Sequence, residues 1–232
     1  MFDLFDLFCL CWCCLMGVFS ESVSLSVMEG DTVTLNTDLN EVHEDNDIVW
    51  TFGDDNSLIA EINRVAGIFN TLDYVPDGRF RDRLKLDNQT GSLTITNITT
   101  QHTGLYKLAI SGAELTSKTF RVSVYAPVPT PVITRDCSSS SSSQQKCSLL
   151  CSVVNVGHVT LSWYKGNSLL SSISVSDLSI SLSLPLEVEY QEKNSYSCVI
   201  NNPIRNQTTH LDISKLCQPC AGMGVVILTF IY

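Results

Sequence analysis

Short segments that alternate apolar with polar residues recur along most of the chain. In the first half they include Val23–Val27, Leu93–Ile95 and Phe120–Val124. In the second half the segment 178–184 alternates strictly, which puts four apolar side chains on one face: Leu178, Ile180, Leu182 and Leu184. A period of two at short spacing, with turn residues between the segments, is typical of antiparallel sheets that face water on one side. The pattern therefore predicts an all-β fold built from sandwiches.

A proline-rich segment separates two parts of different composition. Residues 126–131 contain three prolines, which cannot continue a central strand and favour an extended connector. Residues 21–125 carry 16 acidic and 8 basic side chains and no cysteine, whereas residues 132–220 carry 6 of each sign and six cysteines. We therefore expect two domains, 21–125 and 132–220, with a linker at 126–131.

The cysteines and the opening segment indicate the secretory pathway. Four of the ten cysteines lie in residues 1–20, an apolar stretch that suits a signal peptide cut near Ser20, although it carries Asp3 and Asp6 and no basic residue. An uncleaved anchor or a buried helix is the alternative. Cleavage leaves an even number of cysteines, six, which is typical of disulfides in an oxidising compartment.

Charge and glycosylation motifs support an extracellular protein. The 232 residues have a net charge of −10, which disfavours nucleic acid and anionic membrane surfaces as partners. An apolar content of 44% is enough for packed cores. Three Asn-X-Thr motifs fit a secreted chain, and their acceptors are Asn88, Asn97 and Asn206.

The second half carries four residue types at a diagnostic spacing. Cys151 is followed after twelve residues by Trp163, and Tyr196 comes two residues before Cys198. In an immunoglobulin sandwich such cysteines bridge the two sheets, the tryptophan packs on the bridge, and the tyrosine hydroxyl anchors a corner. The short separation of the cysteines favours a constant-like domain.

The first half has the same framework without the bridge. Trp50 occupies the tryptophan position and Tyr106 the corner position, whereas Thr37 and Leu108 stand where the cysteines would be. His102 stands where a variable-type domain usually has aspartate, which weakens an expected ion pair to one of two arginines, Arg79 or Arg81. We expect a variable-type domain that forgoes the roughly 2–4 kcal/mol of a disulfide.

A variable-type domain without its disulfide, followed by a short constant-like domain with extra cysteines, resembles the SLAM-type lymphocyte adhesion family over residues 21–220. The resemblance implies a second bridge, between Cys147 and Cys217, beside Cys151–Cys198. Cys147 lies four residues before Cys151 and so faces the same way, which agrees with that pairing. Cys137 could reach Cys220, although six cysteines allow fifteen pairings.

Other chemistry finds little support in the residues. Cys217 and Cys220 could form a redox or zinc motif, but the chain lacks a βαβ pattern for the first and histidines at ligand spacing for the second. No nucleophile elbow or metalloprotease motif occurs. We therefore expect no enzyme activity, no metal and no cofactor.

The C-terminal segment 221–232 is apolar but short. As a helix its twelve residues would span about 18 Å, against roughly 30 Å of hydrocarbon. It could be a truncated span, an atypical lipid-anchor signal or the end of a secreted form. We expect attachment to the cell surface through this end, with a secreted decoy or modulator as the alternative.

Strand parity identifies a candidate binding face in the first domain. With Leu108 inward in the place of a cysteine, its neighbours Lys107 and Ala109 point outward, and the same parity exposes Arg121 and Ser123 and, beside Trp50, Thr51. The resemblance implies that this face, with glycans on the opposite sheet, meets an Ig-like domain of another cell-surface protein, homophilic or heterophilic. Lys107 and Arg121 suggest an acidic partner surface, unless they are ordinary solvated charges.

Overall fold

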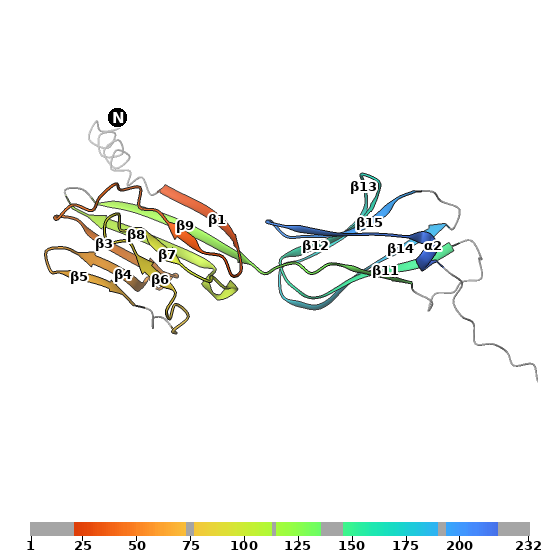
Figure 1. Cartoon of the computed structure of the whole chain (residues 1–232), viewed down its shortest axis with the longest axis horizontal. Coiled ribbons are helices and arrows are strands. Elements are labelled where there is room, and N and C mark those ends of the chain that lie inside the picture. Colours follow the sequence, from red (N-terminus) through yellow and green to blue (C-terminus); the bar gives the residue numbers. More distant parts are fainter. Residues whose placement is uncertain (1–20, 73–76, 113–114, 136–145, 190–193, 218–232) are drawn as a thin grey trace, which may run out of the picture. The chain divides into compact units, whose positions relative to one another are not determined.

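The computed structural model describes residues 21–72, 77–112, 115–135, 146–189 and 194–217. The chain divides into two compact units between Ala126 and Pro127. Each unit is a β-sandwich, and we call them the first and the second domain (Figure 1). The fold is all-β, and the described helical segments are a single 3-10 turn, η1 (Thr100–His102), and one short helix, α2 (Ile213–Leu216).

The first domain packs a large sheet against a small one. The small sheet has the order β2-β7-β6, with bounds β2 (Val33–Leu35), β7 (Leu93–Ile95) and β6 (Leu84–Leu86). The large sheet has the order β1-β9-β8-β3-β4-β5, with bounds β1 (Glu21–Met28), β9 (Thr116–Tyr125), β8 (Gly104–Ser111), β3 (Asp47–Phe52), β4 (Ser57–Asn63) and β5 (Ile68–Thr71). β1 runs parallel to β9, and the other pairs in both sheets are antiparallel.

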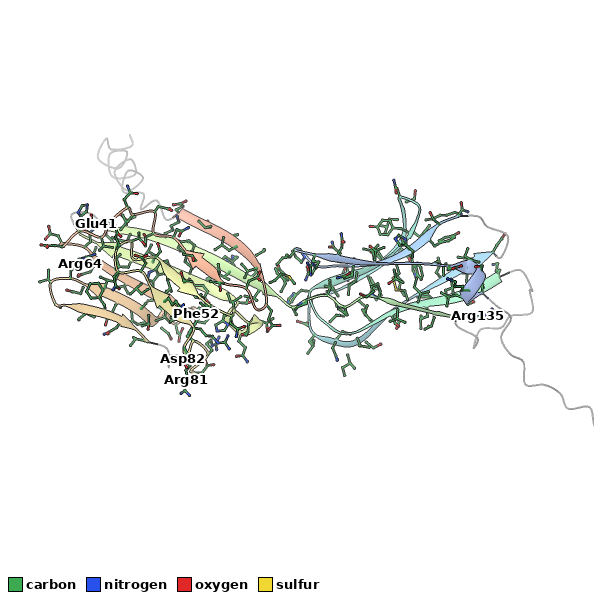
Figure 2. All side chains as sticks on the ribbon, in the orientation of Figure 1. Glu41, Phe52, Arg64, Arg81, Asp82 and Arg135 are labelled. Atoms are coloured by element: carbon green, nitrogen blue, oxygen red, sulfur yellow. A yellow bond between two sulfur atoms is a disulfide. The ribbon has the colours of Figure 1, made fainter. Side chains whose placement is uncertain are left out.

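The core of the first domain lies between these sheets. The predicted tryptophan, Trp50, is fully buried, as are Leu35 and Leu93 from the facing small sheet. An aromatic cluster fills one end, where Phe52, labelled in Figure 2, has its ring centroid 4.8 Å from that of Tyr106 and 5.1 Å from that of Phe80. Such burial of large side chains supplies the stabilisation that a sandwich needs.

The second domain also has two sheets. One has the order β10-β11-β14, with bounds β10 (Val132–Arg135), β11 (Lys146–Val156) and β14 (Ser179–Glu189). The other has the order β13-β12-β15-β16, with bounds β13 (Ser168–Val175), β12 (Val159–Lys165), β15 (Tyr196–Asn201) and β16 (Asn206–His210). In a constant-type domain the fourth strand would join the first sheet. Here a two-residue turn, with Gly166 at φ 57°, makes β13 the antiparallel neighbour of β12.

The alternating segment of the second half is only partly in the core. Leu182 is buried, but Leu178 and Ile180 are 81% and 84% exposed. The reason lies in the paired strand β11, where Asn155 has a left-handed φ of 52° and the alternation breaks. Val153 and Val156, three residues apart, are both buried there, so the residues of β14 that precede Leu182 leave the core. The apolar face predicted along this segment is therefore buried at Leu182 and exposed at Leu178 and Ile180.

Candidate binding face

The outer face of the large sheet in the first domain carries the predicted face residues. Along β8, Tyr106, Leu108 and Ile110 are buried, so Lys107 and Ala109 between them point outward. In β9, Phe120, Val122 and Val124 are buried in the same way, which puts the side chains of Arg121 and Ser123 on the outer face.

The strand register shows how these side chains are arranged. Lys107 lies opposite Thr51 of β3, and Ala109 lies opposite Val49. Arg121 lies opposite Leu105 of β8 on one side and Ser24 of β1 on the other, and Ser123 lies opposite Ser26. Lys107 donates a hydrogen bond of 2.7 Å to Asn56 Oδ1, which holds its ammonium group at the surface. The centre of the face is therefore small or apolar, with cations over β8 and β9.

Two acidic residues on the same face were missed by the sequence analysis. Glu61 of β4 lies opposite Val49, in the row of Ala109, and Asp47 of β3 lies opposite Ser111. The outward position of Glu61 depends on a β-bulge between Trp50 and Thr51, which leaves Ile59 and Ala60 of β4 both buried. Asp47 points outward by simple alternation from Trp50 along β3. Simple alternation along β4 does not reveal that bulge. The face therefore has a cationic part over β8 and β9 and an acidic part over β3 and β4.

The core of the first domain joins its two sheets without a disulfide. Trp50 Nε1 donates a hydrogen bond of 2.9 Å to the carbonyl of Gly91, on the opposite sheet's β6–β7 connection. Thr37, at the position of a missing cysteine, donates from Oγ1 to the carbonyl of Thr90 at 2.6 Å. Leu108, at the position of the second missing cysteine, lies opposite Trp50 and is 2% exposed. Apolar packing and two hydrogen bonds thus occupy the site of the bridge.

The corner of the first domain also departs from the variable-type pattern. Tyr106 donates its hydroxyl hydrogen bond to the carbonyl of His102 at 2.7 Å, and burial raises the pKa of that hydroxyl. His102 Nε2 is 2.9 Å from the carbonyl of Arg79. Arg79 instead pairs with Asp77 at 2.8 Å and holds the pKa of that carboxyl at about 2 through the hydrogen bond. The ion pair is therefore relocated, and Arg81, labelled in Figure 2, is exposed.

One lysine of β9 points inward at the domain's edge. Lys118 is 9% exposed and lies opposite Leu108. Its ammonium group contacts Asp38 and lies 3.4 Å from the carboxylate of Glu21, and the hydrogen bond that it donates to Asp38 raises the pKa of Lys118. Its ammonium also lies 5.4 Å from the ring centroid of Phe120. The charge is thus satisfied internally and is not part of the outer face.

The glycosylation motifs of the first domain lie with the small sheet. Asn88 is in the connection between β6 and β7, and Asn97 is the second residue after β7; both side chains are exposed. Asn206, at the start of β16 in the second domain, is exposed as well. Glycans on Asn88 and Asn97 would therefore extend from the sheet opposite the candidate face.

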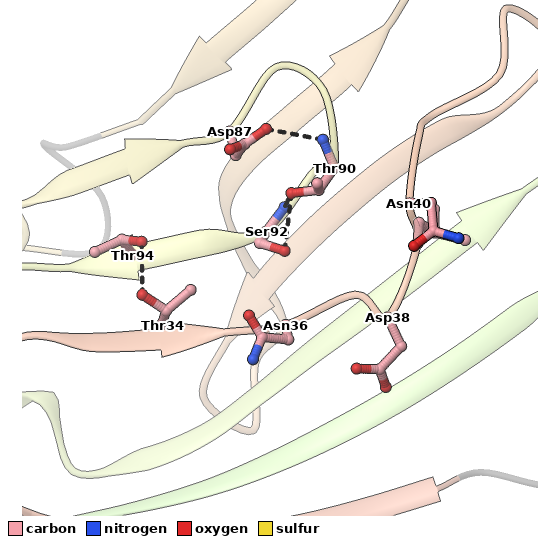
Figure 3. Close-up of a pocket in the computed structure, with 9 residues that line it drawn as sticks. Thr34, Asn36, Asp38, Asn40, Asp87, Thr90, Ser92 and Thr94 are labelled. Atoms are coloured by element: carbon pink, nitrogen blue, oxygen red, sulfur yellow. Dashed lines mark hydrogen bonds between the residues drawn. The ribbon is translucent and has the colours of Figure 1, made fainter.

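A polar hollow of about 470 Å³ lies over the small sheet (Figure 3). Its rim includes two carboxylates, but Asp87 already accepts hydrogen bonds of 2.8 Å from the amides of Gln89 and Thr90, which lower its pKa. Asp38 is engaged by Lys118. The hydroxyls of Thr34 and Thr94 bond to each other at 2.9 Å. The hollow thus offers solvated polar groups and lacks a paired nucleophile and base.

The second domain contains two disulfides among its described residues. Cys151 and Cys198 are joined across the two sheets, with Cα atoms 6.5 Å apart, and Trp163 lies opposite Cys198. Cys147 and Cys217 form the other bridge, with Cα atoms 5.7 Å apart. Cys137 and Cys220 lie outside the described residues. Because Cys217 is in a disulfide, it is not the free thiol that a redox or zinc motif needs.

Two further observations concern the whole described part of the chain. Within these residues, no group of three or more His, Cys, Asp or Glu side chains could hold a metal ion. None of the helices described there is both long enough and apolar enough to cross a membrane. The proposed signal peptide, residues 1–20, and the apolar segment 221–232 lie outside the described residues.

Comparisons with known proteins agree with this architecture. Residues 20–125 match the family model of the immunoglobulin V-set domain. SLAM family member 5 of Mus musculus is 23% identical over 212 residues, which are 90% of this chain and 59% of that protein. CD48 antigen of Homo sapiens is 23% identical over 207 residues, 88% of this chain and 79% of that protein.

A solved structure shows the same fold. The crystal structure of the CD2-binding domain of CD58 superposes with a TM-score of 0.57 at 20% identity, over 82% of this chain and 95% of that chain. The relatives found by sequence are immunoglobulin-superfamily receptors and not enzymes. Residues 20–125 thus match the immunoglobulin V-set family, and the chain is similar to members of the SLAM family.

Proposed function

We propose that this protein is an immune-type recognition protein of the cell surface, and that the outer face of its large sheet binds an Ig-like domain of another surface protein. The relatives support adhesion or recognition as the class of function. The solved structure with the same fold is, by its description, a domain of CD58 that binds CD2. The candidate face itself supports the location, because both glycosylation motifs of this domain lie with the other sheet.

The observation that carries the proposal is the division of charge on this face. Lys107 and Arg121 lie over β8 and β9, whereas Glu61 and Asp47 lie over β3 and β4, with Thr51 between them. A partner must therefore present both signs of charge. A second copy of this chain meets that need, because one two-fold arrangement of two such faces sets the cationic part of each copy against the acidic part of the other.

A charge-swap experiment on cell–cell adhesion tests the proposal. Lys107→Glu/Arg121→Glu makes the face acidic throughout, and Glu61→Lys/Asp47→Lys makes it basic throughout. Each variant should lose adhesion between cells that carry the same variant, since like charges meet. Cells that carry the first variant should adhere to cells that carry the second, because opposite charges meet again.

The matched control changes the same charges away from the face. Arg81→Glu/Lys85→Glu places two reversals on exposed side chains outside the large sheet and should leave adhesion intact. Adhesion by both face variants at wild-type surface levels would remove this face from the proposal. Loss by both without rescue in the mixed pairing would rule out the second copy and leave a different Ig-like domain as the partner.

We also propose that the chain enters the secretory pathway, that residues 1–20 are removed as a signal peptide, and that segment 221–232 attaches the protein to the outer side of the plasma membrane. Two disulfides and three exposed glycosylation motifs support the compartment. Fractionation of expressing cells, with glycosidase treatment, tests this. Recovery of the glycosylated chain in the medium alone would overturn the attachment and favour a secreted decoy.

A further inference from the structure

The described edge strands of the second domain differ in how they are protected from pairing with another chain. β14 carries Pro185, Glu187 and Glu189, and β10 has only four residues. β16 begins at the glycosylation acceptor Asn206. Proline, charge, short length and bulky surface groups all discourage an edge strand from pairing with a further strand. β13 has none of these features, since its eight residues are serine, leucine, isoleucine and valine.

β13 is also exposed and suited to pairing. It is an edge of the described sheet and bonds to β12, so alternate backbone N–H and C=O groups face away from that sheet. Three of its apolar side chains are substantially exposed: Leu169 at 56%, Leu170 at 44% and Ile173 at 38%. A register shift opposite Trp163 and Tyr164 is a bulge of the kind that protects an edge, so the unprotected part of β13 is the regular stretch from Ser171 to Val175. An uncharged, β-branched and serine-rich edge of this kind favours strand addition.

A groove continues from this edge toward β14. It has a volume of about 490 Å³ and is lined in part by Leu170 of β13 and by Pro185 and Leu186 of β14. Its charges are balanced, because Lys146 lies 3.5 Å from Glu187, and Lys165 and Glu189 also line it. A strand docked on β13 would therefore meet apolar surface and both signs of charge, with no net field to repel an identical surface.

We propose that β13 pairs antiparallel with β13 of a second copy on the same membrane, so that two four-stranded sheets join into one. Two copies of the strand suit each other, because β13 contains only serine and aliphatic residues. A two-fold axis perpendicular to the strand sets these residues against residues of the same kinds and brings no like charges together. Every copy of this chain supplies the same unprotected edge. This interface lies in the second domain and is independent of the proposed face in the first.

Single cysteines in the full chain, expressed on cells, test the pairing. Leu169→Cys, Ser172→Cys and Ser174→Cys lie on one side of β13, opposite Tyr164, Ser162 and Thr160 of β12. Non-reducing gels should show a reducible dimer that is strongest at one of the three positions, because opposing residues are close only near the two-fold axis. His210→Cys, on the exposed far edge of the same sheet, is the matched control and should remain monomeric.

The dimer should persist when Lys107→Glu/Arg121→Glu is added, which separates this interface from the proposed binding face. Co-precipitation of two differently tagged wild-type chains gives a second measurement that needs no new cysteine. Ser172→Lys should reduce co-precipitation at least about tenfold, whereas His210→Lys should leave it unchanged. Monomers at all three β13 positions, equal dimer with His210→Cys, a cross-linked product of another size, or equal effects of the two lysines would each overturn the proposal.

Discussion

The two domains solve the same problem, the joining of two sheets, in different ways. In the second domain Cys151–Cys198 crosses between the sheets, and Trp163 Nε1 bonds the carbonyl of Leu184, the residue opposite Cys151. In the first domain Trp50 makes the equivalent bond to Gly91, but Thr37 and Leu108 occupy the cysteine positions.

The comparison shows which part of the framework the two domains share. Both tryptophans are fully buried and both reach a backbone carbonyl of the opposite sheet at 2.9 Å. The covalent bond, in contrast, is present in one domain only. The buried tryptophan with its hydrogen bond is thus common to both sandwiches, whereas the bridge can be replaced by packing and a threonine hydroxyl.

The largest expected difference between the domains concerns loss of the inter-sheet disulfide. Replacing Cys151 and Cys198 by alanine should cost the second domain about 2–5 kcal/mol of unfolding free energy, since an inter-sheet bridge in a small extracellular domain constrains the unfolded chain. Hydrogen exchange of the full chain should show lost protection in β11, β12 and β15 and no change in β3 and β8. Equal loss in both domains would mean that they unfold as one unit.

The second test removes the residue that replaces a cysteine in the first domain. Leu108→Ala should cost about 2–5 kcal/mol, because it opens a cavity beside Trp50 in a packed core. Leu105→Ala, on the outer face of the same strand, is the matched control and should cost well under half as much. Thermal unfolding followed by tryptophan fluorescence measures both. Similar losses would show that Leu108 does not substitute for the bridge.

The third test concerns the threonine. Thr37→Val keeps the shape but removes the hydrogen bond that Oγ1 donates to the Thr90 carbonyl and the one that it accepts from the Leu39 amide. The change should cost about 1–3 kcal/mol, because both backbone groups lose a partner in a part-buried place. Thr34→Val removes an exposed bond between two hydroxyls and should cost less. Chemical denaturation with equal slopes for the two variants gives the comparison. If Thr37→Val left the unfolding free energy unchanged, the packing of Leu108 and not the threonine would replace the missing disulfide.

The smallest expected effect concerns the stability of the first domain at low pH. Arg79 lowers the pKa of Asp77 from an ordinary 3.8 to about 2 in the folded first domain. Because the folded pKa is depressed, the pair stabilises the domain above about pH 3.8, and this contribution is lost as pH falls toward 2. Carboxyl titration by NMR should show Asp77 near 2 in the wild type and at a higher pKa in Arg79→Gln, which loses the guanidinium but keeps the backbone amide that donates to Asp77. An unchanged pKa of Asp77 in Arg79→Gln would show that Arg79 is not the cause of the low value.

The sequence predicts the parts of this fold that follow simple alternation. The outward positions of Lys107 and Arg121 depend on regular strands, β8 and β9, where every second residue is buried. Glu61 could not be placed from the sequence because the bulge beside Trp50 shifts the register of β4 by one residue. Ile180 was misplaced for a similar reason, since one left-handed residue in the neighbouring strand, Asn155, changes which side chains face the core.

The parallel pairing of β1 with β9 gives the first domain a particular response to tension. The two strands carry its first and last residues and are paired over eight positions, from Glu21 with Lys118 to Met28 with Tyr125. A pull on the ends of the domain therefore loads this ladder in shear, so that its hydrogen bonds resist together and not one at a time. Once the ladder fails, no bridge limits extension, and the domain could release roughly 350 Å of chain. The second domain could not, because Cys147–Cys217 closes a loop with a sequence separation of 70.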